Sequence, residues 1–133
     1  MRLTSGQRRL IALGYGLALF VWLQVEDNSP LPVALFGGGL AILLTLDRLS
    51  RSVPARCRLA GAALLGGIAG VGSTLATVAL MLLKTGLHSH LFPDYPPGQM
   101  LAMLQRAPTW GLAGALAGLG MVLAIEGMSD ERA

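Results

Sequence analysis

The sequence predicts an all-α fold, an integral membrane four-helix bundle formed by the whole chain, residues 1–133, as a single domain. Its composition is the first reason: 53% of the residues are hydrophobic. Only 13% are charged, against about 25% in an average soluble domain. The second reason is their order, because the apolar residues gather in four runs that contain no charged side chain. Each run is expected to be helical, since unpaired backbone groups cannot face lipid.

Polar residues and prolines bound the four expected spans. The spans cover residues 10–25, 31–46, 59–83 and 107–125. The first two are shorter than the roughly 20 residues that cross a hydrocarbon core, and flanking arginines extend them by reaching the headgroups. Pro32 and Pro108 stand in first helical turns, where proline is tolerated, and Gly86 is expected to end the third helix.

The basic residues set the expected orientation. Most of them lie in the N-terminal arm, in the connection at 47–58 and in the C-terminal tail, whereas the connection at 84–106 holds only Lys84 and Arg106. Short loops rich in Lys and Arg stay in the cytoplasm. Nine arginines against one lysine are typical of a GC-rich bacterial genome. Both termini are therefore expected in the cytoplasm and the chain in the bacterial inner membrane, with an outer loop at 84–106.

Stripes of small residues mark the expected contacts between helices. In the third span they recur at steps of three or four, which keeps them on one face, and the fourth span repeats the pattern. Small residues let helix backbones approach closely, which drives association in lipid. We expect an antiparallel hairpin of these two spans, with Gly70 level with Gly118. The expected packing residues are Ala62, Gly66, Gly70, Ser73, Thr77, Gly111, Gly114 and Gly118.

Three successive glycines, Gly37, Gly38 and Gly39, interrupt the second span. Each costs about 1 kcal/mol relative to alanine in an exposed helix. They indicate a packing kink, which is the interpretation we favour, or a surface that a neighbouring helix or a cofactor ring approaches closely.

The four runs contain no Asp, Glu, Lys, Arg or His. Ion-coupled transport needs such groups inside the bilayer, and thiol–disulfide chemistry needs paired cysteines, whereas Cys57 is the only one. We therefore expect no enzyme and no catalytic residue. The hydroxyls of Ser73, Thr74 and Thr77 are expected to donate to carbonyl groups one turn earlier in their own helix.

The outer loop carries the most distinctive residues. Prolines at 93, 96 and 97 fix an extended course, and a short helix with an apolar face follows at 100–104. Such a helix lies in the membrane interface or docks a partner. Most aromatic residues, Trp22 among them, also fall on this side, whereas a membrane belt is usually two-sided. The residues expected to face a partner are Phe92, Tyr95, Met100, Met103, Leu104 and Trp110.

His88 and His90 lie two residues apart and would share one face of an extended segment. With Asp94 they offer two imidazoles and a carboxylate, a ligand set that metals accept, and a porphyrin-type ligand is an alternative. The spacing is loose and no second motif supports it. Imidazoles bonded to lipid phosphate, backbone or water are therefore the favoured interpretation, and we expect no metal or cofactor.

These features favour a small non-catalytic accessory or scaffold subunit of a larger bacterial membrane complex. Energy-transducing complexes, respiratory or photosynthetic, are the hosts to consider first, because such small subunits are common in them. One alternative is a self-assembling channel or small-solute carrier, with Ser73 and Thr77 lining a path between protomers. Another is a protein that holds a metal or cofactor through His88 and His90. The expected partners are the lipid bilayer and other membrane protein subunits, and no nucleic acid.

Overall fold

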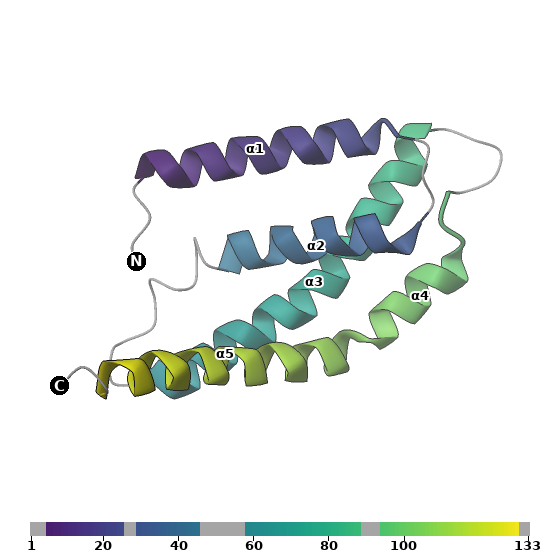
Figure 1. Cartoon of the computed structure of the whole chain (residues 1–133). Coiled ribbons are helices and arrows are strands. Elements are labelled where there is room, and N and C mark those ends of the chain that lie inside the picture. Colours follow the sequence, from purple (N-terminus) through teal and green to yellow (C-terminus); the bar gives the residue numbers. More distant parts are fainter. Residues whose placement is uncertain (1–4, 26–28, 46–57, 89–93, 131–133) are drawn as a thin grey trace.

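The computed structural model describes residues 5–25, 29–45, 58–88 and 94–130. Within these residues all regular structure is helical, so the predicted all-α class is confirmed. Their five helices include the short one expected near 100–104 (Figure 1). The helices are α1 (Ser5–Leu23), α2 (Pro30–Leu44), α3 (Arg58–His88), α4 (Pro97–Gln105) and α5 (Ala107–Asp130).

Prolines begin α2 and α4. Ser29 and Pro96 are extended, with ψ of 133° and 146°, and Pro30 and Pro97 follow as the first helical residues. Proline loses nothing there, because the first N–H groups of a helix have no partner within it. Only Arg106 separates α4 from α5, and the chain changes direction at that residue (Figure 1).

The third helix is longer than predicted. Instead of ending at Gly86, α3 continues to His88. Lys84, which was expected in the outer loop at 84–106, therefore belongs to the helix. A glycine inside a helix costs only about 1 kcal/mol, and it ends a helix only where the glycine itself adopts a left-handed conformation. A side chain at Gly86 would meet nothing within 4 Å, so packing does not explain the glycine there.

The long helices run alternately in opposite directions, and the first turn of α1 and the last turn of α5 lie at the same end of the bundle (Figure 1). Helix α3 crosses the others obliquely and packs most extensively against α5, and then against α2. Among the described helices, α1 has the fewest close backbone approaches to its neighbours. The bundle is therefore tight around α3 and loose around α1.

The buried core lies at one end of the bundle, where α1 ends, α2 begins and α3 ends. We call this region the aromatic end. It is formed by the buried Trp22, Leu23, Val33, Leu80, Met81 and Tyr95, with Leu19, Phe36, Met100 and Met103 packed against them. Elsewhere, large apolar side chains lie on the surface of all the long helices.

One of the described helices is long and apolar enough to cross a membrane, namely α3 over Leu59–Leu87. Three further apolar stretches, Arg9–Leu23, Pro30–Leu44 and Ala107–Leu123, are shorter. They correspond to the other three predicted spans, whose membrane crossing stays a prediction.

Candidate functional site

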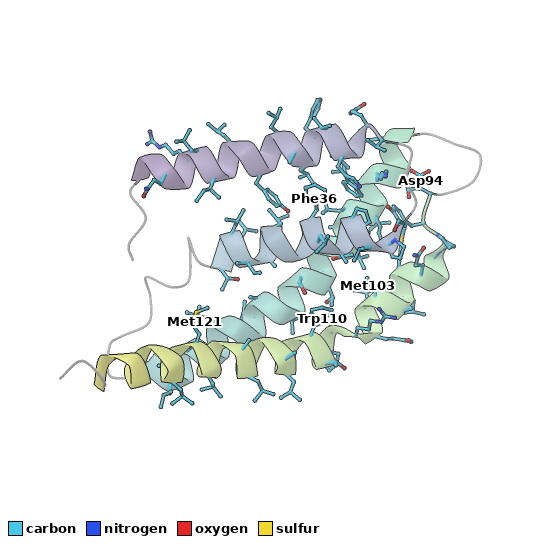
Figure 2. The ribbon with its side chains drawn as sticks, viewed as in Figure 1. Phe36, Asp94, Met103, Trp110 and Met121 are labelled. Carbon is cyan, nitrogen blue, oxygen red and sulfur yellow. The ribbon has the colours of Figure 1, made fainter. Side chains whose placement is uncertain are left out.

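The aromatic end joins residues from four parts of the chain. The Trp22 ring at the end of α1 lies 5.1 Å from the Phe36 ring of α2, between centroids. The Lys84 ammonium of α3 lies 4.4 Å from the centroid of the Trp22 ring. Figure 2 shows Phe36 between α1 and α2, and Asp94 where the chain returns toward α4. This region is where α1 is fixed to the rest of the bundle.

Lys84 corrects the expectation that no charged side chain is buried. The end of the apolar run at Leu83 predicts a loop at Lys84, but this residue lies in α3 with none of its surface exposed. A cation over an indole ring is stabilised by about 2 kcal/mol when both are removed from water. Periodicity could have found it, because Lys84 follows Thr77 and Leu80 at steps of three and four and so continues the packed face of α3.

Trp22 and Tyr95 were expected at an outward face, and both are instead buried within the chain. The Tyr95 hydroxyl donates to the Ser29 carbonyl oxygen at 3.5 Å, which connects the segment before α4 to the start of α2. In the described part of the chain, the buried Trp22 Nε1 has no hydrogen-bond partner. The segment before α4 packs over the helix ends. Trp22 and Tyr95, which could have faced a partner, are therefore core residues.

The other residues expected to face a partner divide into two groups. Met100 and Met103 are half-buried against the core of the aromatic end. Figure 2 shows Met103 on α4. Leu104 is 37% exposed and Trp110 is 51% exposed. Phe92 lies outside the described residues. Only Leu104 and Trp110 of the described set therefore present much of their side chains to the surroundings.

Of the three candidate metal ligands, only Asp94 has a side chain among the described residues. His88 is the last residue of α3 and its side chain lies outside the described residues, as does His90 altogether. Asp94 is half-buried. Among the described residues, no group of three His, Cys, Asp or Glu side chains could hold a metal ion. A ligand at the two histidines stays a hypothesis.

Helices α3 and α5 meet backbone to backbone at their glycines. A Cβ added at Gly70 would lie 2.6 Å from the carbonyl carbon of Trp110 and 3.0 Å from the Cα of Gly111. One added at Gly114 would lie 2.9 Å from the carbonyl carbon of Gly66. Real side chains do not approach backbone atoms so closely, and therefore these positions admit no side chain unless the helices separate.

The register of this pair differs from the expectation. Gly70 lies level with Gly111, not with Gly118, whereas Gly118 lies against Ala62. Counting depth from the ends of the spans failed because α3 continues beyond Leu83 and crosses α5 obliquely. The register is determined instead by the small residues of both helices, where the backbones can touch. These residues recur about every four positions along the two antiparallel helices.

The second half of the stripe on α3 faces α2. A Cβ added at Gly37 would lie 2.6 Å from the Thr77 backbone nitrogen, and one at Gly38 would lie 4.0 Å from the Ser73 Cβ. The expected hydrogen bonds of the hydroxyls are confirmed. Ser73 donates to Gly70 at 2.6 Å, Thr77 to Ser73 at 2.7 Å and Thr74 to Val71 at 2.8 Å.

The glycine triplet of α2 serves two neighbouring helices. While Gly37 faces α3, a Cβ added at Gly39 would lie 2.9 Å from the Tyr15 ring of α1. The Tyr15 hydroxyl donates to the Phe36 carbonyl oxygen, and the two rings pack edge to face with centroids 5.8 Å apart. The triplet is therefore a surface approached by neighbouring helices, the interpretation that the sequence analysis ranked below a kink.

No protein-family model, curated protein or solved structure matches this chain. Its function is therefore inferred from its own residues.

Proposed function

We propose that this chain is an integral membrane protein of the bacterial inner membrane that serves as a non-catalytic accessory subunit of a larger complex. Helices α1, α2, α3 and α5 are the spans, and both termini lie in the cytoplasm. The observation that carries the proposal is the extensive exposure of large apolar side chains along all the long helices.

Many large apolar side chains lie on the surface of the long helices. Leu13 is 70% exposed, Leu35 68% and Leu112 64%, and similar residues cover α3. The middle of the bundle buries Thr74 and Thr77 instead, beside glycines. Proteins folded in water rarely expose apolar patches of more than a few hundred Å². In lipid the same arrangement is favourable, because helices associate there through small residues and close backbone contact.

Helix α1 supports the role of a subunit. Along residues 9–21, Tyr15 and Leu19 are half-buried and the other residues are exposed. Gly14 and Gly16 have open space around them, with no atom within 4 Å of an added Cβ. A span with so little packing inside its own chain is expected where a helix of another subunit completes its contacts.

The channel or carrier hypothesis gains no support from Ser73 and Thr77. Thr77 is 2% exposed because α2 covers it, so it does not line a path between protomers. Its hydroxyl donates within α3. The buried Lys84 is the residue from which a transport hypothesis would now have to start, and its ammonium lies against Trp22.

Gentle detergent extraction from native membranes, followed by native mass determination, tests the proposal. A hetero-complex much larger than this 13.8 kDa chain is expected. A monomer or a small homo-oligomer would overturn the accessory role, and a chain that alkaline carbonate washes off the membrane would overturn membrane embedding.

A matched pair of variants tests the part assigned to α1. Gly14→Leu and Gly120→Leu both add a side chain where nothing lies within 4 Å, one on α1 and one on α5. Neither is expected to change the stability of the isolated chain. Gly14→Leu is expected to reduce the amount of chain recovered in the complex, and Gly120→Leu much less. Equal recovery for Gly14→Leu and wild type would exclude this face of α1 as the docking surface.

A further inference from the structure

The junction between α4 and α5 carries a charged side chain at the edge of an apolar stretch. Arg106 alone separates the two helices, and the apolar stretch of α5, Ala107–Leu123, begins directly after it. The Arg106 side chain is exposed. Its backbone is fixed, because its N–H donates to the Met103 carbonyl oxygen at 3.1 Å and its carbonyl oxygen accepts from the Trp110 N–H at 3.0 Å. The junction therefore holds a cation at a defined place on the surface.

Large apolar side chains on both sides of Arg106 are exposed as well. In α4, Leu101 is 56% exposed and Leu104 is 37% exposed, whereas the other side of this helix packs on the aromatic end. Trp110, one helical turn after Arg106 and so on the same side of the chain, is 51% exposed. We call Leu101, Leu104, Arg106 and Trp110 the elbow patch. It combines apolar side chains, an amphipathic ring and one cation.

The elbow patch lies away from the surface that was assigned above to a partner subunit. In Figure 1, α1 and the junction of α4 with α5 are on opposite sides of the bundle, with α2 and α3 between them. Along the direction of the long helices, the junction lies near the ends at which α1 finishes and α2 begins (Figure 1). This is the outer end of the bundle in the proposed topology, where outer-leaflet headgroups meet the apolar surface.

The charge of the elbow patch complements a phosphate group. Among the side chains that the structure describes, Asp94 is the one carboxylate, and it precedes α4, at the end of that helix away from Arg106. Figure 2 shows Asp94 well apart from Trp110. A guanidinium group binds phosphate through paired hydrogen bonds. An indole ring suits the level of the headgroups, because its body is apolar and its N–H is polar.

We propose that the elbow patch binds an anionic phospholipid of the outer leaflet, with the headgroup phosphate at Arg106 and an acyl chain against Leu104 and Trp110. The inference rests on the membrane embedding proposed above, and it adds the class of lipid and the residue that recognises it. Phospholipids supply a phosphate at this level of the membrane all around the bundle, so that the exposed cation is matched without a specific protein partner.

Quenching of Trp110 by brominated lipid tests the inference. Trp22→Phe leaves Trp110 as the one tryptophan of the chain, and this full-length variant is placed in vesicles of phosphatidylcholine and phosphatidylglycerol. One of the two lipids at a time carries bromine on its acyl chains. We expect the quenching to correspond to an enrichment of phosphatidylglycerol beside Trp110 of about fivefold. Arg106→Gln in the same background is expected to abolish this enrichment.

Matched controls separate lost lipid binding from lost folding. Arg9→Gln removes another exposed arginine, on α1, and is expected to leave the enrichment at Trp110 unchanged. Trp110→Phe leaves the buried Trp22, which is expected to be quenched little by either lipid. Because the Arg106 side chain is exposed, Arg106→Gln is expected to leave unfolding followed by circular dichroism unchanged. Wild type, in which the shielded Trp22 adds a constant signal, repeats the comparison without the Trp22 substitution.

The outcomes separate this inference from the proposal on which it rests. Equal quenching by the two lipids, quenching by neither, or an enrichment that survives Arg106→Gln overturns the inference and leaves membrane embedding intact. Displacement of brominated phosphatidylglycerol by soluble glycerol phosphate would show that the patch takes phosphate without acyl chains, and this too overturns the assignment to a lipid. Failure of the chain to insert into the vesicles, judged by flotation after a carbonate wash, overturns both.

Discussion

Helices α3 and α5 are held together by contacts between their backbones, whereas α1 is attached to the bundle by contacts between side chains. Along α3 and α5 the backbones themselves meet, at Gly66 and Gly114 and at Gly70 and Trp110. Helix α1 is attached by side chains, with Tyr15 against α2 and Trp22 against Phe36 and Lys84. Beyond these contacts its surface is mostly exposed.

This difference determines how each region tolerates change. Backbone atoms cannot rotate away from an added methyl group as a side chain can. A residue larger than glycine at such a contact therefore forces the two helices apart. Side chains can adopt other rotamers and repack, usually at a cost of less than about 1.5 kcal/mol when the volume is kept. We therefore expect the α3–α5 pair to be rigid and α1 to be the adaptable element.

The largest effect is expected for Gly70→Ala. The added Cβ would overlap the Trp110 carbonyl group and the Gly111 Cα, at a cost of about 3 kcal/mol in the free energy of unfolding. Unfolding of the purified protein in mild detergent, followed by circular dichroism as a denaturing detergent is added, measures it.

Gly67→Ala is the matched control for this prediction. The nearest atom to its Cβ is the Gly111 carbonyl oxygen at 3.6 Å, an ordinary contact. We expect a change within about 1 kcal/mol, toward greater stability because alanine favours helix. Equal losses at Gly67 and Gly70 would contradict the observed register of α3 and α5.

Gly37→Ala extends the comparison to α2 and α3. Its Cβ would lie 2.7 Å from the Thr77 Cα, and we expect a loss of about 2 kcal/mol. Gly38→Ala, whose Cβ would be 4.0 Å from the Ser73 Cβ, is expected to be almost neutral in the same unfolding measurement. A neutral Gly37→Ala would show that α2 is held by side chains, as α1 is.

A pair of tryptophan variants tests the attachment of α1. Trp22 is 8% exposed and Trp110 is 51% exposed. Trp22→Leu removes contacts with Phe36 and Lys84 and is expected to cost about 2 kcal/mol. Trp110→Leu is expected to change stability by less than about 0.5 kcal/mol. Comparable losses for both would mean that Trp110 also packs against the bundle in solution.

The smallest effect is expected for Tyr15→Phe. This change keeps the edge-to-face packing on Phe36 and removes the hydrogen bond to the Phe36 carbonyl oxygen, a loss of about 0.5–1 kcal/mol. Phe20→Leu, on the exposed side of α1, is the control and is expected to be neutral in detergent unfolding. A loss above about 2 kcal/mol for Tyr15→Phe would place α1 among the rigid elements.

The sequence was sufficient for the all-α class and for the existence of the short helix α4. Long charge-free runs predict helices whatever surrounds them. The start of α4 was predicted three residues too late, because Pro97 was expected in the extended segment and is instead the first helical residue. The sequence was insufficient to predict where α3 ends. A glycine ends a helix only where its own backbone becomes left-handed, and the presence of glycine alone does not determine this. Ending the span at its last apolar residue, Leu83, moved Lys84 from the packed face of α3 into a loop.

For the candidate site too, the sequence identified the residues that make contacts but not their partners. Small residues identified the helix faces that meet, but not their register, since a stripe spaced by four residues can be shifted by a turn and still match. Composition identified Trp22 and Tyr95 as residues suited to an interface, where an amphipathic ring has one polar atom. Whether that interface was with lipid, a partner or the chain itself depended on how the segment before α4 folded.

By itself, then, the sequence determined what is local: helical periodicity, a proline in the first turn of α2, the hydroxyls that bond within α3, and the bare faces where helices can meet. The tertiary structure decided that Gly70 meets Gly111, that Gly37 and Gly39 serve different neighbours, and that Lys84 lies against Trp22. The physical reason is the separation along the chain of the residues that interact. Hydrogen bonds within a helix join residues about four apart, whereas register and burial depend on atoms brought together from distant parts of the chain.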